Sequence, residues 1–222
     1  MTPAEAIALQ RELAQRVDVS GTIRPQDVRL VGGVDVSSSP DDPLLTAGVD
    51  VPLGRTPHGA GAAAPPPPPP PSPPPRPLSF REIPVLIEAF RRLETTPDVV
   101  LVDGQGIAHP RRLGIAAHLG LVLNHPTVGV AKSRLCGEST APDLAKGSVS
   151  PLLHRGEEIG RVVRTKQKAS PVFVSPGHRV DMAGAVALAV HFARGYRLPE
   201  PTRKAHLYVN EVRKAAGAPA LL

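Results

Sequence analysis

Three carboxylates in this 222-residue sequence stand where a charged side chain needs a partner. Asp35 lies within the β-branched, glycine-containing run of residues 29–36, and Asp103 ends the apolar run of residues 98–103. Glu82 falls in the first turn of an expected helix. An ionised carboxylate in an apolar strand is costly unless it is paired or binds a metal, so two such residues suggest a shared cation. Magnesium fits, because it prefers a few carboxylates together with water and phosphate oxygens.

Each carboxylate also has a purely structural interpretation. The string Ser79-Phe-Arg-Glu82 has the capping-box pattern, so Glu82 could simply close the start of a helix. Asp103 follows a strand at its carboxyl end, where α/β sheets bind ligands, and this position favours function. For Asp35 alone, the sequence favours neither interpretation.

Cationic and imidazole side chains follow the same apolar runs. The string His109-Pro-Arg-Arg112 puts an imidazole and two guanidiniums near a helix start, which suits phosphate contact, although exposed surface charge explains it equally well. Lys132 directly follows the run of residues 127–131 and could hold a phosphate or be an ordinary exposed lysine. Gly104 and Gly106 give G-x-G after a strand, but the third glycine of a Rossmann nucleotide-binding fingerprint is absent.

Strands and helices must alternate to position these residues. Helices are expected at about residues 3–17, 79–93, 111–123 and 181–194 and from about 201, and strands at 29–36, 98–103, 127–131, 158–164 and 171–174. The order of strand, helix and strand between residues 98 and 131 indicates a parallel pair in an α/β sheet.

The composition changes between residues 37 and 77. Pro65 to Pro77 is proline broken only by Ser72 and Arg76, which predicts polyproline II or disorder and excludes a central strand. No aromatic residue precedes Phe80. Base stacking must therefore use the later part of the chain, unless Arg76 contributes.

Length, charge and cysteine count set wider limits. The length favours one domain over residues 1–222, and a net charge of +6 with a pI near 10.0 suits a polyanionic partner. The single cysteine, Cys136, excludes an internal disulfide and indicates a reducing compartment. No signal peptide is recognisable, and no apolar run approaches the ~18 residues of a membrane span. We therefore expect a cytoplasmic protein without a membrane partner.

Six strings, taken in order, closely resemble the endonuclease V family, also called deoxyinosine 3′-endonuclease. They are VGGVDV at 31–36, LSFREIP at 78–84, VDGQGIAHPRRLG at 102–114, GVAKSRL at 129–135, SPGHRVD at 175–181 and YRLPEPTR at 196–203. The string from Asp103 to Leu113 is highly specific, whereas the capping-box string would be worthless alone. The resemblance spans residues 31–203 with one gap, at 38–77.

The resemblance implies an RNase H-like fold: a mixed central sheet flanked by helices, with a disrupted proline-rich segment between the first strand and the second helix. It implies Mg²⁺, or Mn²⁺ as a substitute, held by Asp35 and Asp103. Glu82 completes the acidic cluster, and His206 assists the metal site. Lys132 corresponds to a lysine near the scissile phosphate, and His109 to the histidine after the D-G-x-G turn.

The resemblance further implies a DNA repair endonuclease that acts as a monomer on DNA, with single-stranded RNA left open as a substrate. Metal-activated water attacks phosphorus in line, at the second phosphodiester 3′ to deoxyinosine, and leaves a 3′-hydroxyl and a 5′-phosphate. The inosine base turns out into a pocket built mainly of backbone groups. The expected nucleic-acid contacts are Arg111, Arg112, Gly104, Gly106, Ile107, Gly137, Lys132 and His178.

The segment of residues 39–77 departs from the family pattern and is expected to be disordered. Relatives carry a P-Y-x-P-G string before L-S-F-R-E, with a tyrosine that wedges into the duplex, where residues 73–77 here read P-P-P-R-P. The two strands that should lie between Asp35 and Glu82 are also not recognisable. Compositional drift and a shifted reading frame both explain this segment.

Three other functions remain open at this point. A binder of inosine-containing nucleic acid with impaired catalysis would keep the acidic cluster without the wedge. Another RNase H-like nuclease, such as a junction resolvase, would also carry acidic residues on strands, although the H-P-R-R-L-G and S-P-G-H strings argue against it. A Rossmann nucleotide-binding protein ranks last because its glycine fingerprint is incomplete.

Overall fold

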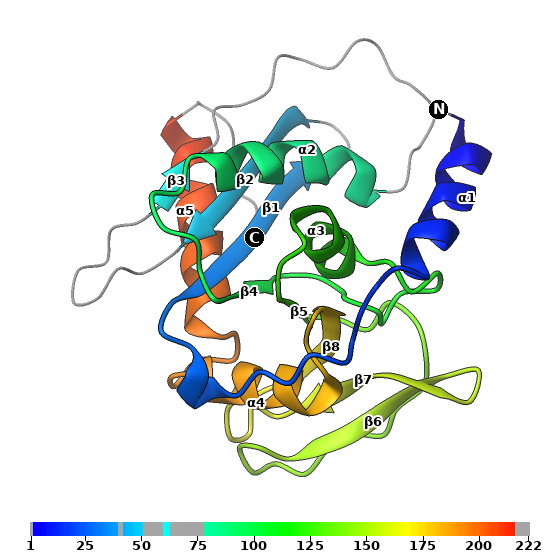
Figure 1. The fold of residues 1–222 in the computed structure, drawn as a ribbon. Helices are drawn as coiled ribbons and strands as arrows, with labels where there is room; N and C mark the ends of the chain where they lie inside the picture. Colours follow the sequence, from blue (N-terminus) through cyan, green and yellow to red (C-terminus); the bar gives the residue numbers. More distant parts are fainter. Residues whose placement is uncertain (1, 40–41, 51–59, 63–77, 216–222) are drawn as a thin grey trace.

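The computed structural model describes residues 2–39, 42–50, 60–62 and 78–215 (Figure 1). Within these residues eight strands form one sheet, in the order β3-β2-β1-β4-β5-β8-β7-β6. The strands are β1 (Val31–Ser39), β2 (Asp42–Asp50), β3 (Ala60–Ala62), β4 (Val99–Val102), β5 (Thr127–Ala131), β6 (Val149–His154), β7 (Glu157–Val163) and β8 (Val172–His178).

The three central strands of this sheet are parallel. β1 pairs with β4, and β4 pairs with β5, so Val34, Val102 and Gly129 lie side by side. All other neighbours are antiparallel. The carboxyl ends of β1, β4 and β5 therefore meet at one edge of a mixed sheet, as expected.

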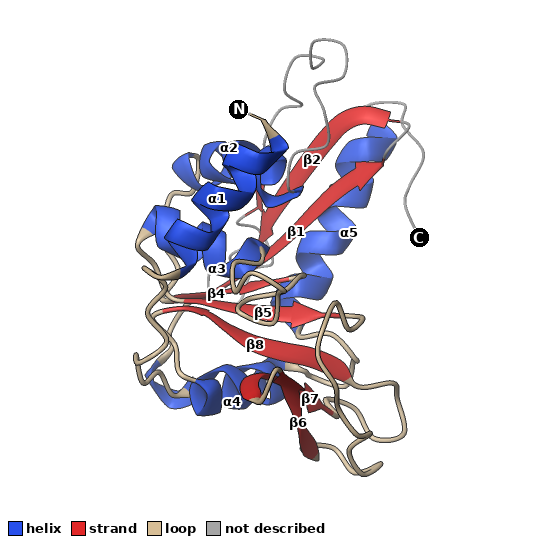
Figure 2. Cartoon of the chain, turned by 90° about the vertical axis from the view of Figure 1, so that its right-hand side faces the viewer, coloured by secondary structure: helices blue, strands red, loops and turns tan. Residues whose placement is uncertain are grey.

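Helices cover both faces of the sheet, and Figure 2 shows the two layers on either side of β1. They are α1 (Pro3–Ala14), α2 (Leu78–Arg91), α3 (Ile115–Leu123), α4 (Met182–Phe192) and α5 (Glu200–Ala215), with a 3₁₀ turn at Pro25–Asp27. On one face, Val34 and Val102 pack against Leu86 of α2 and Leu119 of α3. On the other, apolar residues of β4, β5 and β8 pack against α4, while α5 runs along β1 and β2. No described helix is long and apolar enough to cross a lipid bilayer.

The absence of strands between residues 39 and 77 is the main prediction that the structure overturns. β2 pairs antiparallel with β1 from Gly33↔Asp50 to Ser39↔Asp42, and β3 pairs with β2. β2 obtains its backbone partners from β1, and such pairing depends more on tertiary context than on a local side-chain pattern. The tract Pro65–Pro77, predicted to be polyproline II or disordered, lies outside the described residues.

Two smaller differences have local causes. β6, which is not predicted from the sequence, pairs with β7 as a hairpin through residues 155 and 156, both of which have positive φ. α3 begins at Ile115 rather than near Arg111, because Arg112 has a φ of 60° and residues 109–114 form turns before the helix. These turns place the string from His109 to Arg112 beside the end of β4.

Candidate active site

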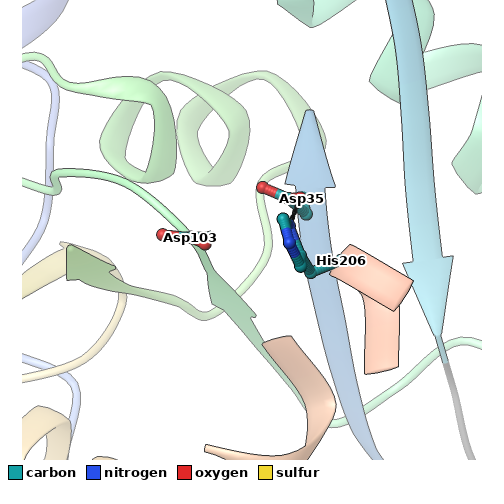
Figure 3. Close-up of side chains that lie close together, drawn as sticks. All are labelled: Asp35, Asp103 and His206. Carbon is teal, nitrogen blue, oxygen red and sulfur yellow. Dashed lines mark hydrogen bonds and ion pairs between the residues drawn. The ribbon is translucent and has the colours of Figure 1, made fainter. Parts of the chain in front are cut away.

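Asp35 and His206 come together from opposite parts of the chain. Asp35 lies in β1 with 8% of its surface exposed, and its Oδ2 lies at a hydrogen-bonding distance of 2.8 Å from Nδ1 of His206 in α5 (Figure 3). Nε2 of His206 lies 3.2 Å from Nδ2 of Asn210 on the next turn of the same helix. Gly33 permits this approach, because a Cβ there would lie 2.0 Å from the carbonyl oxygen of Pro201. The glycine within the first strand therefore has a packing role.

Asp103 joins this pair because β4 lies parallel to β1. It follows the last residue of β4, so its carboxylate stands at the strand edge beside Asp35. Asp35, Asp103 and His206 each offer one potential metal ligand atom, and these three atoms all lie within 4.8 Å of one another. Asp35 and Asp103 thus come together, and the third group at this spacing is His206 rather than Glu82.

Lys132 balances part of the negative charge. Its Nζ lies 2.8 Å from Oδ2 of Asp103, although the contact does not have hydrogen-bond angles. Among the described residues, this buried Oδ2 atom accepts no hydrogen bond. The carboxylates of Asp35 and Asp103 and the imidazole of His206, with one Asp103 oxygen that accepts no hydrogen bond, fit a divalent cation that takes oxygen and nitrogen ligands.

Electrostatics at the cluster favour a positive charge. Burial raises the pKa of Asp35, and the nearby Asp103 charge raises it further, against the opposing effects of His206 and Lys132. Glu82 in α2 is 6% exposed and lies outside the group whose ligand atoms meet. Burial raises its pKa to about 7, and the charge of Asp35 adds to this effect. A cation at the cluster would stabilise the ionised form of both carboxyls.

The start of α2 does not form the predicted capping box. α2 begins at Leu78, so Ser79 lies inside its first turn, and Ser79 Oγ lies 3.2 Å from Nδ1 of His118 in α3. The rings of Phe80 and His118 meet edge to face with centroids 4.7 Å apart. Burial lowers the pKa of His118 to about 4. This buried contact ties the first turn of α2, one turn before Glu82, to α3.

A pocket of about 450 Å³ opens beside the cluster. Its lining includes Glu82 and Asp103, the turn residues Gly104 and Gln105, the ring of His109 and Arg111. His109 is neutral in this position, because burial and then Arg111 and Arg112 lower its pKa to about 4, and its Nδ1 accepts a hydrogen bond from the Arg111 backbone N–H. The pocket thus combines neutral polar groups, one guanidinium and two carboxyls.

The glycine-rich turn beside this pocket is held against β8. Gly106 donates its N–H to Ser175 Oγ at 2.9 Å, and the Ile107 N–H donates to the Pro176 carbonyl at 2.8 Å. A Cβ on Gly106 would lie 1.9 Å from that same carbonyl oxygen. Glycine is therefore required at this position for packing, whatever the turn binds.

Gln10 also lines the pocket, although the sequence does not predict it as a site residue. It is 1% exposed, its Nε2 donates to the Leu113 carbonyl at 2.8 Å, and its Oε1 accepts from Nε of Arg111. Through Gln10, α1 closes one wall of the pocket and orients Arg111. No local sequence signal distinguishes this glutamine from an ordinary helical one.

Three expected nucleic-acid contacts lie apart from the acidic cluster. Arg112 is held within the fold, at 2.6 Å from Glu157 and 3.0 Å from the His109 carbonyl. His178 lies opposite Thr127, at the far end of β5 from Lys132, and its Nδ1 accepts from the Asp18 N–H. Gly137 has a φ of 82° and packs against the backbone of β6.

Known proteins resemble this chain over most of its length. The endonuclease V family model matches residues 11–207. The chain is 46% identical over 218 residues to endonuclease V of Dehalococcoides mccartyi strain BAV1, covering 96% of this chain and 94% of that protein. It is 48% identical over 219 residues to endonuclease V of Gloeobacter violaceus, covering 97% and 88% respectively.

Solved structures show the same fold. The crystal structure of endonuclease V from Streptomyces avermitilis has a TM-score of 0.85 and 37% identity, covering 98% of this chain and 96% of that one. Endonuclease V from Ciona intestinalis, in complex with a 23mer DNA containing an inosine followed by a ribo-adenosine, has a TM-score of 0.77 and 26% identity, covering 96% and 97%. The RNase H-like fold is therefore confirmed, and this chain belongs to the endonuclease V family of nucleases.

Proposed function

We propose that this chain is a Mg²⁺-dependent DNA repair endonuclease that nicks the second phosphodiester 3′ to deoxyinosine and leaves a 3′-hydroxyl and a 5′-phosphate. The observation that carries this proposal is the meeting of Asp35, Asp103 and His206 within 4.8 Å, with Lys132 beside Asp103. The family membership of the chain supports the reaction, and the DNA bound by the Ciona relative supports the substrate class.

Asp35 and Asp103 would hold the cation, with His206 assisting and Mn²⁺ as a substitute for Mg²⁺. Bound there, the cation supplies Lewis acidity toward a phosphate oxygen and lowers the pKa of an attacking water. His206 keeps its orientation through Asp35 on one side and Asn210 on the other. This arrangement holds the ligand atoms in place before substrate arrives.

Lys132 would contact the scissile phosphate, and Glu82 would exchange protons near it. The Lys132 side chain is 42% exposed, so its ammonium can turn from Asp103 to a phosphate oxygen when substrate binds. Glu82, with a pKa of about 7 in the metal-free protein, can release a proton when a cation binds and accept one from water near neutral pH. His109 faces the pocket as a neutral imidazole.

The pocket beside Asp103 would receive the flipped inosine base. Its volume of about 450 Å³ lies within the range of small-molecule sites, and Gly104 and Gln105 of the glycine-rich turn line it, whereas Gly106 and Ile107 do not. Arg111, oriented by Gln10, lines the same pocket and would contact the base or the adjoining phosphate.

A nicking assay tests this proposal. The full chain is incubated with Mg²⁺ and end-labelled DNA or RNA oligonucleotides that carry one inosine, with inosine-free oligonucleotides and the Asp103→Asn variant as controls. We expect a cut one nucleotide beyond the inosine, at an end that DNA ligase can reseal after annealing to a splint. Selective binding of inosine oligonucleotides without any cut would instead favour the catalytically impaired binder.

A further inference from the structure

Tyr196 is the exposed aromatic residue in the described part of the chain. The sequence has four phenylalanines and two tyrosines and no tryptophan, and all six aromatic residues lie in described segments. Tyr196 is 49% exposed, whereas the other five are buried or intermediate. It lies in the loop between α4 and α5, and no step of the proposed reaction uses it.

A guanidinium covers part of the Tyr196 ring. Arg203 Cζ lies 4.3 Å from the ring centroid, in a cation–π arrangement. Arg203 is held in turn by Glu200, with contacts of 3.0 Å from Nε and 2.6 Å from Nη2. The ring is therefore fixed from one side while nearly half of the residue remains open to solvent.

Two connections place this pair next to the active site. Arg197, the residue after Tyr196, donates through Nη2 to the carbonyl oxygen of Lys132 at 2.6 Å. Arg203 lies three residues before His206 in α5, so the two side chains share one helix face, with Cβ atoms about 5–6 Å apart. The Tyr196 loop is thus tied to the backbone of Lys132, and the cation over its ring lies on the helix that carries His206.

The charge around the ring suits a polyanion. Residues 194–204 contain four cationic side chains and one carboxylate. That carboxylate, Glu200, is already paired with Arg203. Phosphates that enter the site would find cations on this side, and the base attached to such a phosphate would find a flat ring.

We propose that Tyr196, backed by Arg203, is a stacking subsite for one unpaired nucleobase adjoining the scissile phosphate. This inference rests on the proposed function, because it takes the scissile phosphate to lie at Lys132 and the acidic cluster. Stacking on an aromatic ring tolerates every base, since each base has a π face, so the subsite contributes affinity and register rather than base specificity. It is separate from the pocket beside Asp103, whose lining does not include Tyr196.

The test uses the full chain and single-stranded oligonucleotides with one deoxyinosine. A series of such oligonucleotides each carries one abasic site, at a different nucleotide on either side of the expected cut. Binding is measured by fluorescence anisotropy in EDTA at fixed salt, and the single-turnover rate is measured with Mg²⁺ over a range of enzyme concentrations. The variants are Tyr196→Ala and Tyr196→Phe, with Tyr208→Ala, in α5 and half-buried, as the matched control.

We expect Tyr196→Ala to bind the intact strand on the order of five- to a hundredfold more weakly, and Tyr196→Phe to bind it nearly as well as the wild type. At one abasic position the wild type and Tyr196→Ala should bind equally, because the base that stacks is gone. Tyr208→Ala should show no such position. The half-saturating enzyme concentration should rise more than the maximal rate falls, since the subsite binds rather than reacts.

Two outcomes would overturn the subsite. In the first, Tyr196→Ala binds the intact strand within twofold of the wild type. In the second, Tyr196→Ala binds every abasic strand more weakly than the wild type by the same factor as the intact strand, which would indicate a general structural effect. A wild-type protein that fails to cut any inosine substrate would overturn the proposed function instead, and the anisotropy series would still report on stacking.

Discussion

Binding of a divalent cation should release protons in a pH-dependent way, and Glu82 should contribute to this release near neutral pH. Burial and the charge of Asp35 raise the pKa of Glu82 to about 7. A cation at Asp35, Asp103 and His206 stabilises the ionised carboxylate, so it expels the proton that Glu82 holds below that pH. The Glu82→Gln variant has no such proton to release.

The magnitude follows from the raised pKa. A group with a pKa of about 7 is about 90% protonated at pH 6 and about 10% protonated at pH 8, so proton release should fall from about 0.9 to about 0.1 per cation. The apparent cation affinity should rise about tenfold between pH 6 and pH 8 from this group alone. Asp35 adds its own release, but it does so in both proteins, and the difference between them isolates Glu82.

The same shift changes the stability of the metal-free protein. A carboxyl whose pKa rises from 4.5 to about 7 on folding is stabilising below its unfolded pKa and loses that contribution as the pH rises through 7. Each pKa unit corresponds to about 1.4 kcal/mol, so the loss between pH 4.5 and pH 8 is on the order of 3 kcal/mol. Glu82→Gln should lack this loss in urea denaturation with EDTA.

Isothermal titration calorimetry measures the proton release. Mg²⁺ and Mn²⁺ are titrated into the full chain at pH 6 and pH 8, each in two buffers with different ionisation enthalpies. Glu88→Gln is the control, because Glu88 lies in the same helix with a side chain that is 47% exposed. If Glu82→Gln released as many protons as the wild type at pH 6, Glu82 would not be coupled to the cation and the reasoning would fail.

Four further perturbations test other parts of the site. Asp35→Ala or Asp103→Ala should abolish nicking while circular dichroism stays unchanged, because each removes a cation ligand and also a like charge; nicking at the wild-type rate would refute the metal assignment. Lys132→Ala should slow the single-turnover cut by roughly ten- to a hundredfold while calorimetry still detects Mg²⁺ binding, for a lost phosphate contact of ~1–3 kcal/mol; an unchanged rate would make it an ordinary surface lysine. Burial holds the pKa of His118 at about 4, below its ordinary 6.5, so protonation favours unfolding as the pH falls below 6.5. The free energy of unfolding of the wild type, measured with urea, should therefore fall by about 2 kcal/mol between pH 7 and pH 5 because of His118, and His118→Gln should lack this decrease. An equal decrease in both proteins would show that the His118 ring is not buried in solution. Because no aromatic residue precedes Phe80, single-stranded inosine substrates should be cut faster than duplexes in matched single-turnover assays, and equal rates would show that another residue wedges.

The sequence by itself determined the central strands and the carboxylates at their ends. The apolar runs that became β4 and β5 are long enough to mark buried strands, and Asp103 and Lys132 directly follow them. Because the strands are parallel, both side chains had to reach the same sheet edge. The six strings, in their order along the chain, were also enough to identify the family, because they place the same kinds of residue after the same strands.

Only the tertiary structure decided which of these groups meet. His206 lies 171 positions from Asp35, and their contact depends on α5 packing against Gly33. Ser79 pairs with His118 instead of capping its own helix. Periodicity and capping patterns describe neighbours within a few residues, whereas these contacts arise when distant elements pack and bury polar groups that then need partners.

β2 and Gln10 show the same limit at the level of the fold and the pocket. β2 forms although no strand is recognisable in its segment of the sequence, because the edge of β1 offers backbone donors and acceptors that an extended segment can meet. Gln10 becomes a pocket residue because α1 packs beside α3, where its amide satisfies a carbonyl and a guanidinium. Backbone pairing and buried amide contacts leave no periodic trace in the residues that make them, so they become visible only once the chain is folded.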